Sequence, residues 1–448
     1  MKTILDNKIA DMKEDIIKAV LENVAIMSIK SEAEEGAPFG PGPRDALLNA
    51  IDQSERLGLP AVNIDNKIGY TEIGSGEEMV AILGHLDVVP LGDGWTQKPE
   101  GELVGDKLYG RGTADNKGPV IASLYALKAI KDLGIDLNRR IRLIYGTDEE
   151  TAFECVQHYI DSGQELPVMG FTPDGNYPAI YAEKGAVGFK FTKKIKNNPN
   201  FELISLTGGV AKNVVMPAVD MVYRSKDKIL PGSTPNASGE YSLRVMGNSA
   251  HASTPEEGKN ALMILCRDLV ALDLGGDLAE FADFIDTKFN FEPNGNSLGV
   301  YFEDETGKIT LSIGLIDFKD NEISFTVDTR YPVTMDRKAF IDKMKLAADE
   351  YGFDMEVTKE TDGLYVPKDS KLITTLMSVY KEKTGDSSEA MAIGGGTYAK
   401  AFDNMVAFGI EFPGETLPLH QPDEYVLVDN LIRSTQISAE AIVRLANQ

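Results

Sequence analysis

Ala81-Ile-Leu-Gly-His85-Leu-Asp87-Val-Val-Pro90 is the stretch that decides the fold of this chain. It belongs to an apolar run over residues 79–83 that ends just before His85 and Asp87. A short continuous apolar run is typical of a strand that is buried on both faces of a parallel sheet. Because the functional residues of open α/β sheets lie beyond the carboxyl ends of the strands, the sequence predicts a site at His85 and Asp87.

The segments around this strand predict an α/β domain. Strands that alternate with helices favour a mainly parallel, twisted sheet that is flanked by helices. Two of the later strands end in acidic loops, at Glu149-Glu150 and at Asp174, and a long Gly- and Asp-rich loop over 91–118 contains Asp115. Loops of that length are usually functional. The expected elements are strands over 61–70, 140–145 and 166–171 and helices over 1–22, 45–57, 120–133 and 151–162.

From about residue 189 the pattern changes to shorter, alternating strands, which indicates a sheet with one exposed face. We therefore predict a discontinuous domain of residues 1–184 and 371–448, with an α+β domain of residues 185–370 inserted in it. The inserted elements are strands over 189–195, 201–206, 241–246 and 322–329 and helices over 259–273, 276–289 and 336–350.

Composition excludes several classes of partner. The chain has 448 residues, and its 70 acidic against 45 basic residues give a net charge of −25, which argues against nucleic acid and anionic membranes as partners. No apolar run reaches the length of a membrane span, and the amphipathic first 22 residues do not resemble a signal peptide. Cys155 and Cys266, far apart in the sequence, are expected to be reduced thiols in a cytoplasmic protein.

The strand-end residues have the chemistry of a metal site, because imidazole and carboxylate are the ligands that borderline divalent cations prefer. In extended backbone, residues i and i+2 point the same way, so Asp87 can accept the second ring N–H of His85. Glu149 and Glu150 point to opposite sides, so that one can bind a metal while the other acts as a base. His158 lies inside a predicted helix and is expected to have a surface or packing role. The alternative interpretation is that these residues belong to solvated acidic loops. It is less favoured because all these motifs follow strands of one predicted sheet.

Six motifs in this order resemble the M20 dinuclear metallopeptidases, and the resemblance covers nearly the whole chain. They are His85-Leu-Asp87, Gly110-Arg-Gly-Thr-Ala-Asp115-Asn-Lys-Gly118, Asp148-Glu149-Glu150, Pro173-Asp174-Gly175, Gly247-Asn-Ser-Ala-His251-Ala-Ser-Thr-Pro255 and Leu419-His420.

The resemblance implies roles for these residues. Two divalent cations are expected, zinc first, with manganese or cobalt as alternatives. The implied ligands are His85, Asp115 and Asp174 for one metal, and Asp115, Glu150 and His420 for the other. Asp115 would bridge the metals, with a cis peptide bond to Asn116. Asp87 would orient His85, Glu149 would be the general base, and His251 of the inserted lid domain would polarise the scissile carbonyl.

The resemblance also narrows the substrate. Asp174 and the long lid are similar to the PepV-type dipeptidases, which implies a monomer. The resemblance also implies that Asn213 and Arg330 bind substrate, with the guanidinium of Arg330 pairing with a carboxylate of the substrate. Without the resemblance, Arg330 would be interpreted as a surface arginine that follows a strand. Backbone N–H groups at Gly395 and Gly396, before a helix-like segment, can also receive a carboxylate.

We therefore predict a metallo-dipeptidase for small peptides, including β-alanyl dipeptides, that uses a metal-bridged water with Glu149 as base. Deacylation of N-acyl amino acids at the same centre is the alternative, and a non-catalytic metal- or peptide-binding protein is less favoured. Two weaker motifs are set aside. Gly295-Asn-Ser297-Leu-Gly299 lacks the strand–turn–helix context of a nucleophilic serine, and Gly110-Arg-Gly112 lacks the third glycine of a dinucleotide site.

Overall fold

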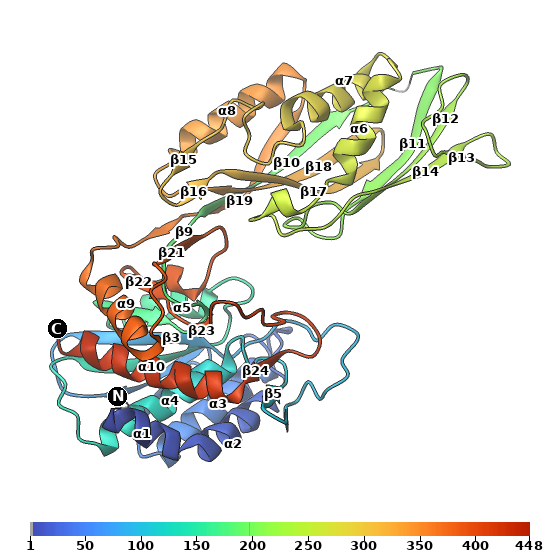
Figure 1. The fold of residues 1–448 in the computed structure, drawn as a ribbon. Helices are drawn as coiled ribbons and strands as arrows, with labels where there is room; N and C mark the ends of the chain where they lie inside the picture. The colour runs from blue at the N-terminus through green and yellow to red at the C-terminus, as the bar shows by residue number, and fades with distance from the viewer. Residues whose placement is uncertain (1–2, 197) are drawn as a thin grey trace. The chain divides into compact units, whose positions relative to one another are not determined.

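The computed structural model describes residues 3–196 and 198–448. The chain forms two compact units, each built around its own sheet (Figure 1). The first comprises Met1–Tyr181, Val366–Met391 and Gly396–Gln448, and the second Ala182–Tyr365 and Ala392–Gly395. Residues 392–395 correct the sequence-based division, which left them in the first unit. They follow the second unit because Lys184 N donates to the carbonyl oxygen of Ile393 at 2.9 Å.

The sheet of the first unit is parallel at its centre. Its strand order runs β1-β2-β6-β3-β7-β22-β9, and β3 lies between β6 and β7 with both pairings parallel. All seven residues of β3 are buried, as its apolar run predicted. These strands are β1 (Ala61–Ile64), β2 (Ile68–Ile73), β3 (Met79–His85), β6 (Arg140–Gly146), β7 (Met169–Thr172), β22 (Met405–Ala407) and β9 (Ile180–Glu183), and β20 (Leu364–Tyr365) and β21 (Met391–Ile393) both pair with β9.

The predicted α/β class is confirmed, although the sheet is mixed at its margins. The single strand expected over 61–70 is two antiparallel strands, because Asp65 and Asn66 both take positive φ, at 54° and 55°. Two successive residues of positive φ match the twist of paired strands, and the three-residue connection 65–67 reverses the chain. β2 also pairs antiparallel with β6, and β22 with β9.

Helices cover the sheet of the first unit, and α4 and α10 both pack on β3 and on each other. The expected first helix is two helices that meet at Met12. The helices are α1 (Ile4–Asp11), α2 (Lys13–Val24), α3 (Pro41–Arg56), α4 (Lys117–Asp132), α5 (Glu154–Asp161), α9 (Lys371–Thr384) and α10 (Val428–Ala446).

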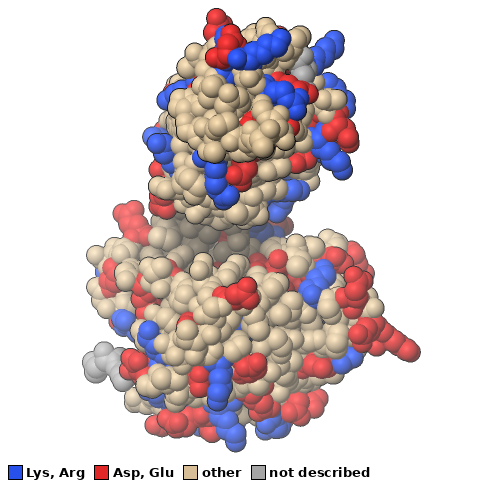
Figure 2. Space-filling view, turned by 90° about the vertical axis from the view of Figure 1, so that its right-hand side faces the viewer, with Lys and Arg blue, Asp and Glu red and all other residues tan. Residues whose placement is uncertain are grey.

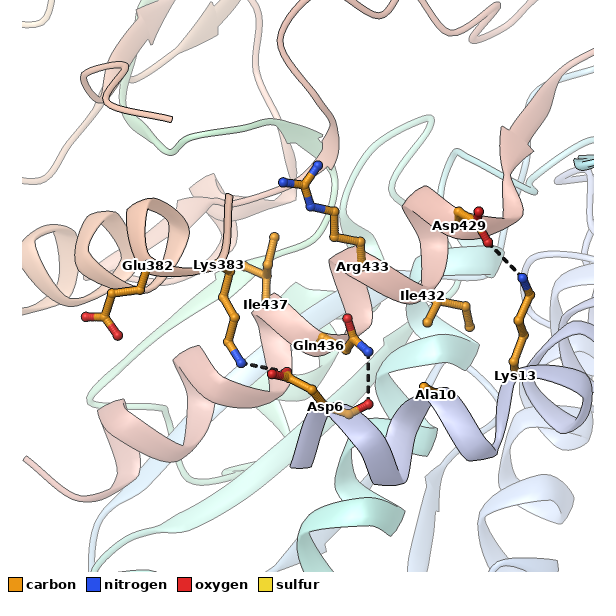
Figure 3. Close-up of a pocket in the computed structure, with 10 residues that line it drawn as sticks. All are labelled: Asp6, Ala10, Lys13, Glu382, Lys383, Asp429, Ile432, Arg433, Gln436 and Ile437. Atoms are coloured by element: carbon orange, nitrogen blue, oxygen red, sulfur yellow. Dashed lines mark hydrogen bonds and ion pairs between the residues drawn. The ribbon is translucent and has the colours of Figure 1, made fainter. Parts of the chain in front are cut away.

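Ion pairs join α1 to α9 and α2 to α10, around a pocket of about 540 Å³ (Figure 3). Lys383 pairs with Asp6 at 2.6 Å, and Lys13 pairs with Asp429 at 2.7 Å. The residues that line this pocket include none of the predicted site residues.

The segment expected as a long loop contains a hairpin. β4 (Glu102–Val104) and β5 (Lys107–Tyr109) form it, and β5 also pairs with β24 (Tyr425–Leu427). Residues 405–411 form two short strands, β22 and β23 (Ile410–Glu411), and β23 pairs with β8 (Gly175–Asn176).

The second unit is α+β, as predicted. Its sheet has the order β13-β14-β12-β11-β17-β18-β10-β19, and α6, α7 and α8 lie along one face (Figure 1). Burial alternates strictly along β18, so its other face is more open. The elements are β10 (Gly185–Lys194), β11 (Phe201–Gly208), β12 (Ala218–Ser225), β13 (Thr234–Pro235), β14 (Tyr241–Met246), α6 (Ala261–Ala271), α7 (Asp277–Phe284), β17 (Thr310–Lys319), β18 (Glu322–Tyr331), α8 (Arg337–Glu350) and β19 (Asp354–Thr361).

Aromatic side chains fill the core of the second unit. Phe191 of β10 stacks on Phe325 of β18 with 4.9 Å between ring centroids, and Phe284 of α7 closes on Phe353 at 4.7 Å. Residues 296–299, around Ser297, form a turn. Among the described residues, no helix is long and apolar enough to cross a membrane. On the face shown in Figure 2, acidic and basic side chains are interspersed.

Candidate metal centre

The predicted site residues of the first unit meet at one edge of its sheet. His85 is the last residue of β3, the loop after β6 carries Glu149 and Glu150, and the loop after β7 carries Asp174. Because these three strands are parallel neighbours, their carboxyl ends share an edge. Asp115 precedes α4, and His420 lies in the loop between β23 and β24.

Close packing fixes the end of β3. A Cβ on Gly84 would lie 2.3 Å from Val120 Cγ2 and 2.6 Å from Asn116 Oδ1, so the strand passes α4 at a distance that only glycine allows. Asn116 Nδ2 donates to the carbonyl oxygen of Pro173 at 2.7 Å, which joins the start of α4 to the loop of Asp174. The peptide bond between Asp115 and Asn116 is cis, as the family resemblance implied.

Asp115 lies between the two imidazoles and uses a different oxygen for each. Its Oδ1 is 3.1 Å from His85 Nε2, and its Oδ2 is 3.0 Å from His420 Nε2. His85 Nε2 is also 3.8 Å from Asp174 Oδ2, and His420 Nε2 is 3.2 Å from Glu150 Oε1. The structure thus brings together all five residues expected to bind metal.

Asp87 holds the acidic pair that follows β6. Its two carboxylate oxygens accept the backbone N–H groups of Glu149 and Glu150, each at 3.1 Å. The prediction that this carboxylate accepts the ring N–H of His85 needs correction. His85 Nδ1 lies 3.0 Å from the backbone oxygen of Asp87 and 3.6 Å from its carboxylate, because the carboxylate points toward the two amides.

Electrostatics in this cluster reflect the excess of carboxylates. Hydrogen bonds with Asp115 and Glu150 raise the pKa of His420 to about 10. Burial lowers the pKa of His85, but its contacts with Asp115 and Asp87 outweigh burial, and the net pKa is well above the usual value. Burial raises the pKa of Glu149 well above the usual glutamate value. A cation in the cluster would compete with the protons on both imidazoles.

The donor set fits divalent cations. Two groups of three side chains bring ligand atoms within 4.8 Å of one another, namely His85, Asp115 and Glu150, and His85, Glu149 and Asp174. Buried carboxylates this close repel one another unless a cation lies among them. Lys117, two residues beyond Asp115, does not supply that charge at close range, because its Nζ donates to the backbone oxygens of Asn23 and Ile26. Nitrogen and oxygen donors of this kind suit zinc, manganese or cobalt.

The other predicted residues, apart from Gly396, belong to the second unit. Val214, next to Asn213, forms a β-bridge with His251, and Asn213 accepts the N–H of Ala252 at 2.9 Å. Arg330 donates through Nε to Asp328 at 2.7 Å and lies 3.4 Å from the carbonyl oxygen of Gly394. Gly395 belongs to this unit and Gly396 to the first.

The surroundings of His251 define its tautomer. Ser253 N, which can only donate, is 3.2 Å from His251 Nδ1, so Nδ1 is an acceptor and the proton is on Nε2. Partial burial and the charge of Arg330 lower the pKa of His251, which favours this neutral form. His158 is outside the cluster and pairs with Asp65 at 2.9 Å.

Several buried residues near the centre were missed from the sequence. Arg111 and Glu424 form a buried ion pair at 2.6 Å, and Tyr398 packs its ring edge to face with His85 at 6.1 Å between centroids. Arg111 lies in the motif of Asp115, Tyr398 lies just after Gly396, and Glu424 lies just after His420. The available signal for Glu424 was a charged residue four positions after His420.

This arrangement of imidazoles and carboxylates at the carboxyl edge of an α/β sheet defines a metal-dependent hydrolase. Residues 81–444 match the model of peptidase family M20/M25/M40, and the chain belongs to this family of peptide-bond hydrolases. A Bacillus subtilis (strain 168) relative named "Putative dipeptidase YtjP" is 36% identical over 97% of this chain and 98% of its own.

Solved structures share the fold. Human carnosine dipeptidase 1 is 19% identical, with a TM-score of 0.62 over 99% of this chain and 98% of its own. The Bacillus subtilis YXEP protein, described as a dinuclear metal-binding peptidase of the M20 family, is 13% identical, with a TM-score of 0.57 over 98% of this chain and 99% of its own.

Proposed function

We propose that the protein is a two-metal dipeptidase that hydrolyses the peptide bond of short peptides with a free amino terminus. The observation that carries the proposal is the position of Asp115, whose two oxygens contact the imidazoles of His85 and His420. A carboxylate placed in this way is suited to bridge two cations. Dipeptidase names among relatives at this level of identity support the choice of substrate.

The first unit supplies the ligands. His85, Asp115 and Asp174 would hold one cation, and Asp115, Glu150 and His420 the other. Zinc is the first choice, with manganese and cobalt as alternatives, because all the donors are nitrogen or oxygen. Bound divalent cations lower the pKa of water and polarise a carbonyl group.

Glu149 would move the proton. Its carboxylate lies with His85 and Asp174, and Asp87 fixes its backbone amide at 3.1 Å. From there it takes a proton from the attacking water and passes it to the leaving amine, as a general base that becomes a general acid. The family resemblance implies this role for Glu149, and its position beside His85 and Asp174 is compatible with it.

The second unit would act as the lid and bind the rest of the substrate. His251 has its proton on Nε2 and can donate it to the oxygen of the scissile carbonyl, where negative charge develops. Asp328 holds one edge of the Arg330 guanidinium, and the other edge can pair with the substrate carboxylate. Asn213, Gly395 and Gly396 complete the proposed substrate contacts. We predict a monomer, which sedimentation would test.

The test is a substrate panel on protein loaded with zinc, manganese or cobalt, with metal content measured on the same sample. The panel contains α-dipeptides, β-alanyl dipeptides, tripeptides, and N-acetyl and N-succinyl amino acids. We expect two metal ions per chain and the highest kcat/KM on free dipeptides. A preference for the N-acylated compounds would identify a deacylase instead, and two bound metals without turnover on any substrate would contradict an enzymatic role.

A further inference from the structure

A buried ion pair lies behind the candidate metal centre. Glu424 is 0% exposed and Arg111 is 1% exposed, and Arg111 Nη1 donates to Glu424 Oε2 at 2.6 Å. Burying two charges is costly unless their remaining hydrogen-bonding groups are also paired. The other oxygen of Glu424 is the informative one, because its partners belong to the loop that carries Asp115.

That oxygen accepts three backbone N–H groups. Glu424 Oε1 is 3.0 Å from the nitrogen of Gly112, 3.0 Å from that of Ala114 and 3.2 Å from that of Asp115. The backbone oxygen of Glu424 accepts a fourth, from Gly110 at 3.0 Å. One residue therefore holds the loop over residues 110–115, and its last contact is the amide of Asp115.

The same residue is joined to the second imidazole by only three intervening residues. His420 has φ of 59°, its side chain is 53% exposed, and its loop lacks regular structure before β24 begins at Tyr425. His85, in contrast, is fixed at the end of a buried strand. Glu424 thus joins the loop of His420 to the loop of Asp115, whose Oδ2 is 3.0 Å from His420 Nε2.

We propose that Glu424 is a positioning residue for the metal site formed by Asp115, Glu150 and His420. This inference rests on the proposed function, because it assumes that these three residues bind metal. Glu424 fixes the backbone of the shared ligand Asp115 and anchors the segment of His420, so that both reach one cation. The site of His85 and Asp174 shares Asp115 but depends on Glu424 less, since β3 ends at His85 and Asp174 follows the end of β7 by two residues.

Glu424→Gln is the sharpest variant because it keeps the size of the side chain. One carboxylate oxygen becomes an NH2 group, which must face either Arg111 or the three backbone amides. Both surroundings consist of donors, so an amide satisfies only one of them. Outer residues that orient ligands typically contribute 10- to 100-fold to metal affinity.

The experiment titrates the metal-free protein with Co²⁺ and follows the visible absorption of the bound ion. For Glu424→Gln we expect one Co²⁺ to bind as in the unchanged protein and the second about 10- to 100-fold more weakly. Glu72→Gln is the matched control, because Glu72 of β2 pairs with Arg142 of β6 at 2.7 Å, four residues before β6 ends at Gly146. We expect the control to retain both affinities. Two unchanged affinities in Glu424→Gln would overturn the proposal.

A second variant separates the effect of the three amide contacts of Glu424 from that of its ion pair with Arg111. Arg111→Lys keeps a positive charge and leaves the three amide contacts of Glu424 in place, so we expect a smaller loss of affinity for the second Co²⁺. An equal or larger loss would overturn the assignment to the amide contacts. If the protein without substitutions binds no second Co²⁺, the proposed function is contradicted. This result differs from a loss of affinity that is seen only in the variants.

A measurement on the unchanged protein covers the case in which Glu424→Gln does not fold. Hydrogen exchange in the metal-free protein reports on the amides of Gly112, Ala114 and Asp115. We expect them to exchange far more slowly than in an unstructured peptide of the same sequence, since Glu424 accepts a hydrogen bond from all three. Exchange at the rate of the unstructured peptide would overturn the proposal that Glu424 holds these three amides.

Discussion

At the scale of single residues, the tautomer of His251 follows from one neighbour. The N–H of Ser253 faces His251 Nδ1 and requires it to be an acceptor, which leaves the proton on Nε2. A neutral imidazole of this tautomer can donate its Nε2–H to a carbonyl oxygen. The sequence predicted His251 as a site residue, but its tautomer depends on a backbone contact that no sequence pattern describes.

His251→Ala should lower kcat on dipeptides by about 100- to 1,000-fold, the usual effect of removing one donor to a developing oxyanion. Its metal content should not change, because His251 is not among the proposed ligands. Ser253→Ala is the control. It removes the hydroxyl group 2.7 Å from Nδ1 but keeps the backbone N–H, so its kcat should stay within a few-fold of the unchanged enzyme. Steady-state kinetics check both, and an equal loss in the two variants would refute the assignment.

At the scale of elements, the buried strand β3 and the site residues that follow it could be predicted from the sequence. The turn between β1 and β2 and the contacts of Glu424 could not. The apolar run over residues 79–83 indicated a strand with both faces covered, and β3 is buried throughout. The turn at Asp65 and Asn66 escaped prediction, although both residue types favour turns, because the apolar residues on either side were interpreted as one alternating run. Glu424 escaped because its partners are backbone amides, which are the same for every residue type.

Gly84→Ala tests how closely β3 and α4 must approach. The added Cβ would meet Val120 Cγ2 at 2.3 Å and Asn116 Oδ1 at 2.6 Å, and overpacking of this kind costs about 1–3 kcal/mol of unfolding free energy. Metal affinity should fall as well, because His85 is the next residue. Adding Val120→Ala should restore part of the stability but not the affinity, since Asn116 remains. Urea unfolding and metal titration measure the two effects, and Gly84→Ala with unchanged stability would contradict the packing argument.

At the scale of the whole molecule, the chemistry is divided between the two units. The five proposed ligands and Glu149 belong to the first unit, and His251, Asn213 and Arg330 to the second. The order of the motifs along the chain predicted this division of roles. It could not predict that residues 392–395 pair with the second unit, because that depends on a backbone hydrogen bond between Lys184 and Ile393.

Metal removal should therefore destabilise one unit selectively. A ligand present at 100 times its Kd stabilises a folded protein by about 2.7 kcal/mol, and chelation removes that contribution. We expect faster hydrogen exchange after chelation around Asp115, Glu150 and His420, with no change in β17 and β18 of the second unit. Mass spectrometry of exchanged peptides measures both regions. A uniform increase across the two units would show that the metals do not act through the first unit alone.

The central claim is that Glu149 moves the proton while its neighbours hold the metals. The most direct test is Glu149→Ala, with metal content and dipeptide hydrolysis measured on the same sample. We predict two metal ions per chain, as in the unchanged protein, and a kcat at least about 100-fold lower, the smaller end of what general base catalysis contributes. Retained metal with a kcat near that of the unchanged enzyme would contradict the account.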